Sequence, residues 1–294
     1  PLTVETRINM KSGYKRAFAR CVLLFGAGTV LQFLCGDVNP TWLKHPVSLV
    51  LAINYIYLLI VLIAKSDKWQ WVNRLTSHHA SVSALACMLA VTILFGLTGK
   101  CGPSTWPFCT LLFYFTTVLG LRAIEELRNW KRSPKMAMMI HTTVFVVLAA
   151  AIFSSPDKEK ARVMAHIGKP LHVGISAQTG KTVILPFTLT LEEFIMEEYP
   201  DGAPKTFLSR VKVENRKGMK DFDIEVNHPA RVGSWRIYQV GYDKTMGTDS
   251  SYSVLACVRD GWYPVIKTGL WIILASGILM ALTAGYKRRK EDKK

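Results

Sequence analysis

The chain has 294 residues, of which half are hydrophobic and only 20% are charged, and its mean hydropathy is +0.20. A soluble domain carries about 25% charged residues. The apolar surplus falls in blocks of roughly 16 to 22 residues, the length that crosses a hydrocarbon core of about 30 Å. The composition therefore predicts an integral membrane protein and excludes a soluble enzyme, a disordered basic protein and a free nucleic-acid binder.

Six membrane spans are predicted from these blocks. They are Ala17 to Cys35, Val47 to Ala64, His79 to Leu97, Trp106 to Leu121, Met136 to Phe153 and Val265 to Tyr286. We divide the chain into a five-helix region (1–154), a polar domain (155–262) and a last helix with a basic tail (263–294). The sequence begins at Pro1 without a methionine, which leaves open whether further residues precede it.

The net charge of +16 is distributed unevenly along the chain. Lys and Arg residues gather in the N-terminal segment, in the loops 65–74 and 122–135, and in the tail 287–294, whereas the two short loops on the other side carry only Lys44 and Lys100. By the positive-inside rule, both termini are cytoplasmic and the polar domain is extracytoplasmic. The excess charge then faces anionic lipid of the bilayer, so we expect no nucleic-acid partner.

The polar domain has the period-2 alternation of a β-sheet with one covered face. Strands are predicted at Val211 to Val213, Phe222 to Val226, Trp235 to Tyr242 and Thr182 to Leu191, and a helix is a candidate for Leu191 to Glu198. The expected fold class is thus an α-helical polytopic membrane protein of about six spans with one extracytoplasmic antiparallel β-domain.

Three histidines are the candidate functional residues. His78, His79 and His141 lie at the starts of the third and fifth spans, near the cytoplasmic side. An imidazole at that depth is costly unless it is paired, so it marks a functional site, and neutral imidazole is the commonest ligand of haem iron. His141 is flanked by apolar residues and is the leading candidate, whereas His78 and His79 also fit a role as polar side chains reaching the headgroups.

Other chemistry has little support in the sequence. It has no Ser/His/Asp cluster, no paired carboxylate site and no C-x-x-C pair, so no catalytic residues are predicted. Cys35 and Cys101 both fall at the outer ends of their spans, and a disulfide between them is a hypothesis.

A set of segments spread along the chain resembles the ResB-like (CcsB) family of system II cytochrome c biogenesis. The most similar is Val226-Asn-His-Pro-Ala-Arg-Val-Gly-Ser-Trp-Arg-Ile-Tyr-Gln-Val-Gly-Tyr242. The others are Ser253 to Asp260 with Tyr263-Pro264, Leu185 to Phe194, Tyr199 to Pro204, Gly28 to Gln32 with Gly36, and His141 in the last span before the β-domain.

The resemblance implies a non-autonomous subunit of a haem lyase (holocytochrome c synthase) complex in the bacterial inner (cytoplasmic) membrane. Such a subunit helps carry haem b across the membrane and presents it to apocytochrome c for covalent attachment. The implied partner is a CcsA/ResC-type membrane protein with a WWD motif, which this chain lacks. The resemblance also implies that His141 is an axial ligand of the haem iron. His79 is our reserve candidate for that ligand.

Two alternative functions remain open from the sequence. One is a b-type cytochrome electron-transfer subunit, with haem held between the third and fifth spans by His79 and His141. The other is a structural scaffold of a membrane complex that never contacts haem.

Overall fold

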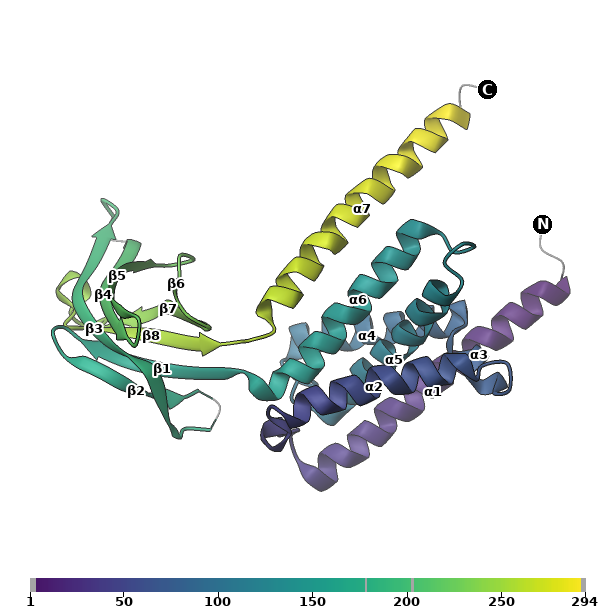
Figure 1. Cartoon of the computed structure of the whole chain (residues 1–294), viewed down its shortest axis with the longest axis horizontal. Helices are drawn as coiled ribbons and strands as arrows, with labels where there is room; N and C mark the ends of the chain where they lie inside the picture. The colour runs from purple at the N-terminus through teal and green to yellow at the C-terminus, as the bar shows by residue number, and fades with distance from the viewer. Residues whose placement is uncertain (1–3, 178, 202–203, 292–294) are drawn as a thin grey trace. The chain divides into compact units, whose positions relative to one another are not determined.

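The computed structural model describes residues 4–177, 179–201 and 204–291, which form helices and one β-sheet domain (Figure 1). The helices are α1 (Val4–Cys35), α2 (Val47–Ala64), α3 (Gln70–Leu75), α4 (His78–Thr98), α5 (Trp106–Arg128), α6 (Lys135–Ser154) and α7 (Tyr263–Glu291). Two compact units result: the helices, in Pro1–Pro156 with Trp262–Lys294, and the β-domain, in Asp157–Gly261.

Six of the described helices are long and apolar enough to cross a membrane. Their apolar portions are Ser12–Cys35, Val47–Ala64, His78–Thr98, Trp106–Arg128, Lys135–Asp157 and Tyr263–Thr283. The expected class of polytopic helical membrane protein is confirmed. The fourth span is longer than predicted, because α5 continues past Leu121 to Arg128 through charged residues that a hydropathy criterion rejects.

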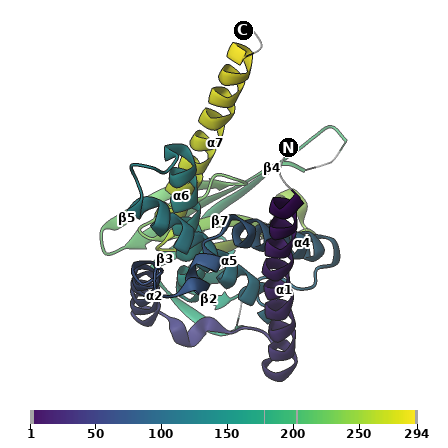
Figure 2. The ribbon, with the colours of Figure 1, turned by 90° about the vertical axis from the view of Figure 1, so that its right-hand side faces the viewer.

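The central helix of the helical unit is α5, which packs against α1, α2, α4 and α6, while α7 packs on α6. Figure 2 shows α1 and α2 on opposite sides of α5. Two glycines permit these close approaches. A Cβ at Gly120 would lie 2.5 Å from Cε2 of Phe145, and one at Gly28 would lie 2.7 Å from Cα of Pro107. Small residues at such contacts are how membrane helices pack without a hydrophobic driving force.

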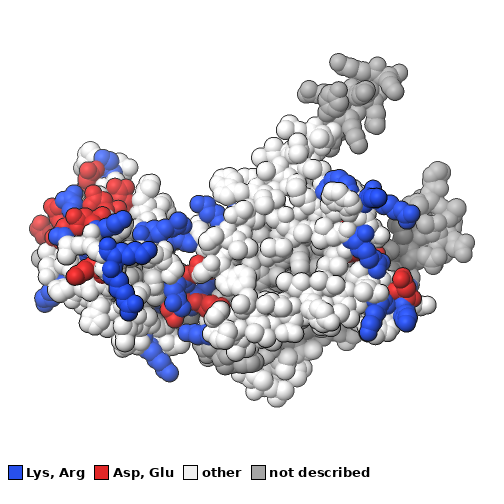
Figure 3. Space-filling view, viewed as in Figure 1, with Lys and Arg blue, Asp and Glu red and all other residues white. Residues whose placement is uncertain are grey.

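Several connections between helices lie together at one end of the helical unit. Nη1 of Arg128, at the end of α5, donates 2.8 Å to the carbonyl of Ile63 near the end of α2. Nη1 of Arg122 donates 3.4 Å to the carbonyl of Thr76, just before α4. On the face shown in Figure 3, the middle of the helical unit is almost free of charge and basic side chains lie at one end of it. This distribution is what a bilayer-spanning bundle requires.

The β-domain is one antiparallel sheet whose strand order is β5-β4-β3-β2-β1-β8-β7-β6. Its strands are β1 (Glu159–His166), β2 (Pro170–Ser176), β3 (Thr182–Glu198), β4 (Pro204–Asn215), β5 (Gly218–Glu225), β6 (Ala230–Val232), β7 (Trp235–Tyr242) and β8 (Tyr252–Arg259). The first and last strands pair in register from Glu159 opposite Arg259 to His166 opposite Tyr252. The chain therefore enters and leaves the sheet at neighbouring points.

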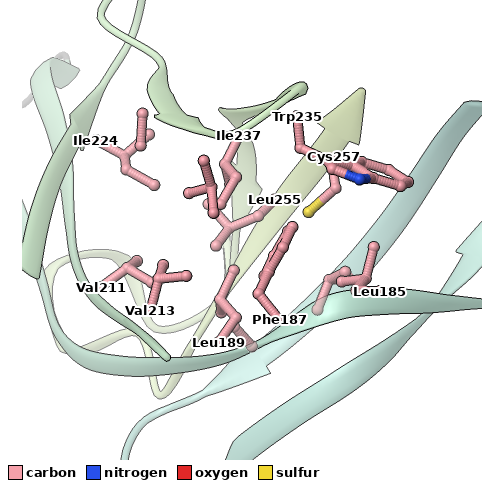
Figure 4. Packing of buried hydrophobic residues seen from close by; sticks show 14 of the residues in the cluster. Leu185, Phe187, Leu189, Val211, Val213, Ile224, Trp235, Ile237, Leu255 and Cys257 are labelled. Atoms are coloured by element: carbon pink, nitrogen blue, oxygen red, sulfur yellow. The ribbon is translucent and has the colours of Figure 1, made fainter. Parts of the chain in front are cut away.

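The core of the β-domain lies on the concave face of the curved sheet. Figure 4 shows side chains from β3, β4, β5, β7 and β8 pointing toward one another, among them Phe187, Val211, Ile237 and Leu255. These residues are at most 4% exposed. The period-2 pattern that predicted the strands is this alternation between a buried and an open face, and the four predicted strands are confirmed.

The predicted helix over Leu191 to Glu198 is wrong, because these residues continue β3. Their carboxylates pair across to β4: Glu192 with Lys212, Glu193 with Arg210 and Glu197 with Lys205. The hydrogen bond from Lys205 lowers the pKa of Glu197, and the one to Glu192 raises the pKa of Lys212. Cross-strand partners of opposite charge thus override the helical preference of the glutamates.

Candidate functional site

A hydrogen-bonded cluster of three charged or titratable side chains links α5 to α6. Nδ1 of His141 lies 2.8 Å from Oε2 of Glu126, and Nε of Arg122 lies 2.7 Å from Oε1 of the same carboxylate. Arg122 and Glu126 are one turn apart on α5, where side chains at i and i+4 meet. His141, in the second turn of α6, approaches from the neighbouring helix.

Glu126 is the innermost member of this cluster. Its side chain is 6% exposed, against 37% for Arg122 and 35% for His141. A carboxylate at that burial needs partners for both oxygens, and the two hydrogen bonds supply them. The hydroxyl of Ser133, in the turn between the helices, donates 3.0 Å to the backbone carbonyl of Glu126. The cluster is thereby fixed at the junction of α5 and α6.

The cluster determines which ring nitrogen of His141 is available. An ionised carboxylate can only accept hydrogen bonds, so Nδ1 carries the proton and donates to Glu126. The lone pair of a neutral imidazole is then on Nε2, and the described part of the chain offers that atom no hydrogen-bond partner. The His141 side chain as a whole is 35% exposed.

This donor set fits an iron ligand. Histidines that bind metals almost always donate their other ring N–H to a carboxylate, a carbonyl or water, and haem iron takes a single protein imidazole on one face. Among the described residues there is no group of three or more His, Cys, Asp or Glu side chains that could hold a metal ion.

The other two candidate histidines have different surroundings. His78 is exposed at the first residue of α4. His79 packs against α1: its ring lies edge-on to Tyr14 with centroids 4.6 Å apart, and a Cβ at Gly13 would lie 3.1 Å from the ring. His79 and His141 thus make their contacts with different helices, α1 and α5.

Two cysteines at the opposite end of the spans bear on the disulfide hypothesis. Cys35 is exposed at the end of α1, and Cys101 packs beside the cluster of apolar residues between α1, α4 and α5. Both are free thiols in this structure, so the hypothetical link is not formed.

A buried polar network explains part of the resemblance motif in the β-domain. Oε1 of Gln239, in β7, accepts hydrogen bonds from the hydroxyl of Ser209 at 2.6 Å and from that of Ser253 at 2.9 Å. Nε2 of Gln239 donates 2.9 Å to the carbonyl of Gly241, where the pairing of β7 with β8 shifts register. Gln239, Gly241 and Ser253 all lie in the segments on which the resemblance rests.

Sequence reasoning missed Glu126 and Arg122. The predicted fourth span ended at Leu121, so both residues were assigned to a basic loop outside the membrane. A signal was present, because Arg and Glu at i and i+4 directly after an apolar run indicate that the helix continues.

Residues 136–263, from α6 through the β-domain, match the ResB-like family, which confirms the resemblance over this range. No curated protein sequence matches the chain. Among solved structures, a chain named cytochrome c haem lyase CcmF is similar at 12% identity and a TM-score of 0.34. The alignment covers 82% of this chain and 46% of that one, so this chain spans less than half its length.

Proposed function

Starting from the match of residues 136–263 to the ResB-like family, we propose that this protein is a membrane subunit of a cytochrome c maturation system. In this proposal it receives haem b within the membrane, holds its iron at His141 and helps present it to apocytochrome c. Haem is the cargo of the system. Covalent attachment belongs to the complex with a CcsA/ResC-type partner.

The geometry of His141 is the observation that carries the proposal. Its Nδ1 is engaged by the buried carboxylate of Glu126, which leaves Nε2 to bind iron. The residue lies in a helix suited to cross a membrane, where an ionisable side chain marks a functional site. A partner that supplies the opposite axial ligand would complete the coordination of haem.

The proposed orientation rests on the basic residues around the cluster. Lys and Arg side chains of residues 65–74 and 122–135 lie at the same end of the helices as His141, since Arg128 bonds the end of α2 and Arg122 bonds Thr76, between α3 and α4. By the positive-inside rule this end is cytoplasmic. The β-domain, which follows the outer end of α6, is then extracytoplasmic in the bacterial cytoplasmic membrane, where apocytochrome c is available.

The packing of the helices favours this proposal over a b-type cytochrome. In the described residues, α5 packs against both α4 and α6, and the ring of His79 is engaged with Tyr14 of α1. A haem held between His79 and His141 would have to displace these contacts. A second ligand from a partner requires no such rearrangement.

The test is the haem content and absorption spectrum of the complex purified with its partner. His141→Ala is expected to lose most bound haem or to change its spectrum, while His172→Ala, an exposed histidine of β2, leaves both unchanged. His79→Ala tests the reserve ligand in the same preparation. Equal haem and identical spectra for wild type and His141→Ala would overturn the proposal.

A scaffold without haem contact is tested in cells. Deleting the gene is expected to abolish maturation of a c-type reporter cytochrome, and His141→Ala is expected to lower it strongly while the complex still assembles. Normal maturation with His141→Ala in an assembled complex would favour the scaffold.

A further inference from the structure

We propose that Glu126 is a positioning residue for haem: its carboxylate, held by Arg122, fixes the His141 ring and makes its Nε2 a stronger donor to iron. This inference rests on the proposed function and assigns a role to a residue upstream of the range that matches the family.

The carboxylate of Glu126 is divided between two partners. Oε1 of Glu126 accepts a 2.7 Å hydrogen bond from the Arg122 guanidinium, and Oε2 accepts one of 2.8 Å from the His141 imidazole. Each oxygen thus has its own partner, and the hydrogen bond to Oε2 restricts rotation of the His141 ring.

Arg122 holds this carboxylate from α5. Its Nε bonds the carboxylate, and its Nη1 reaches the carbonyl of Thr76, which precedes α4. Thr76 is 4% exposed, so that anchor lies inside the helical unit. The position of the His141 ring is thus supported by contacts that run from the turn between α3 and α4 through α5 to α6.

The carboxylate also has an electronic effect on the imidazole. A carboxylate that accepts the Nδ1 proton raises the donor strength of Nε2, and this outer partner is one of the means by which proteins tune a haem iron. A stronger anionic donor stabilises ferric over ferrous iron. Removal of the charge at Glu126 should therefore raise the reduction potential of bound haem.

A purely structural ion pair would behave differently. It would join α5 to α6 and affect assembly or thermal stability without changing the iron. The distinguishing readouts are the reduction potential and the ferrous and ferric absorption spectra, which a merely structural role leaves at wild-type values.

The experiment uses the complex with its partner, purified with haem b bound. Glu126→Gln keeps the side chain's shape and an amide oxygen that can accept from Nδ1, but it removes the charge. We expect this variant to retain haem with a raised reduction potential and shifted spectra. Glu126→Leu, which removes the acceptor, should weaken haem retention by about ten- to a hundredfold.

Glu125→Gln is the matched control, since Glu125 is the adjacent carboxylate on α5 and makes no contact with His141 in the described residues. It should leave the potential and the spectra unchanged. Glu126→Asp, which shortens the side chain but keeps the charge, is expected to fall between wild type and Glu126→Gln.

Two failures can be told apart. A wild-type potential and spectrum in Glu126→Gln, together with a haem signal that depends on His141, would overturn the positioning role and leave the proposed function standing. A haem signal independent of His141 would overturn the proposed function itself. Should Glu126→Gln fail to assemble, Glu126→Asp is measured in the same way, and a wild-type potential and spectrum there overturn the positioning role.

Discussion

Oε1 of Gln32, in α1, accepts a 2.9 Å hydrogen bond from the backbone N–H of Trp106, the first residue of α5. Its Nε2 donates 2.7 Å to Oδ1 of Asp37, which holds the amide in place. The first N–H groups of a helix have no partner within the helix, so Gln32 caps a helix that lies 74 residues further along the chain.

Replacing Gln32 by Leu should destabilise the helical unit. The change removes the cap, and loss of a capping side chain costs about 0.5–2 kcal/mol. Thermal unfolding of the purified protein in detergent measures the effect. Thr29→Val is the control, since Thr29 bonds the carbonyl of Phe25 in its own helix. Equal unfolding midpoints for Gln32→Leu and wild type would show that the cap does not contribute.

The packing of α5 predicts opposite results for two glycines. Gly120→Ala places a Cβ within 2.5 Å of Phe145 and 2.7 Å of Leu59, and overpacking of this kind costs about 1–3 kcal/mol. Gly96, in α4, has no atom within 4 Å of an added Cβ. Gly96→Ala should be neutral or stabilising by up to about 1 kcal/mol. Unfolding midpoints in the same detergent test both, and an equal loss at the two sites would contradict the packing of α5.

The limits of sequence reasoning appear clearly in α5. The apolar runs predicted all six spans, because each must be long and nearly uncharged to cross a bilayer. The same criterion ended the fourth span at Leu121, since it treats a charged residue as a boundary. Glu126 is buried only because Arg122 and His141 pair with it, and the partner on α6 cannot be known before the helices are packed.

In the β-domain, sequence prediction likewise ended β3 too early. Alternation predicted the strand as far as Leu191, where four glutamates begin. The helical preference of these glutamates is a local property of the sequence. The basic residues that pair with them lie on β4, and strand pairing is decided by such non-local partners.

The polar network of the β-domain should be sensitive to substitution of Gln239. Gln239→Leu removes the acceptor shared by the hydroxyls of Ser209 and Ser253, both 0% exposed; they then have only each other, 2.8 Å apart, so one of them loses its acceptor. An unsatisfied buried polar group costs about 1–3 kcal/mol. Limited proteolysis of the full-length protein should cut the β-domain of this variant faster. A matched change at an exposed polar residue, Thr248→Val, should have no effect. Equal protection in the two variants would contradict a stabilising network.

Cys257 should be unreactive in the folded protein. Burial raises the pKa of its thiol from 9.0 to about 12. Because the folded pKa is raised, the contribution of this thiol to stability is complete below pH 9 and is lost as the pH rises toward 12. In a variant that keeps Cys257 as its single cysteine, iodoacetamide at pH 8 should react slowly until denaturant is added. Fast labelling of the native protein would contradict this burial.

The orientation of the helices is tested with Cys35, which is exposed at the end of α1. In a variant with Cys35 as the single cysteine, a membrane-impermeant maleimide should label this thiol in cells whose outer layers have been removed and whose cytoplasmic membrane is intact. A cysteine placed by Lys68→Cys, in the 65–74 loop, should label only after permeabilisation. The reverse labelling pattern would contradict the proposed orientation.

The most direct test of the central claim is chemical rescue at His141. In the complex purified with its partner, His141→Gly should lose the wild-type haem spectrum and recover it when imidazole is added, because free imidazole can occupy the vacated position beside Glu126. Haem that keeps the wild-type spectrum in His141→Gly without imidazole would contradict the assignment of His141 as the iron ligand.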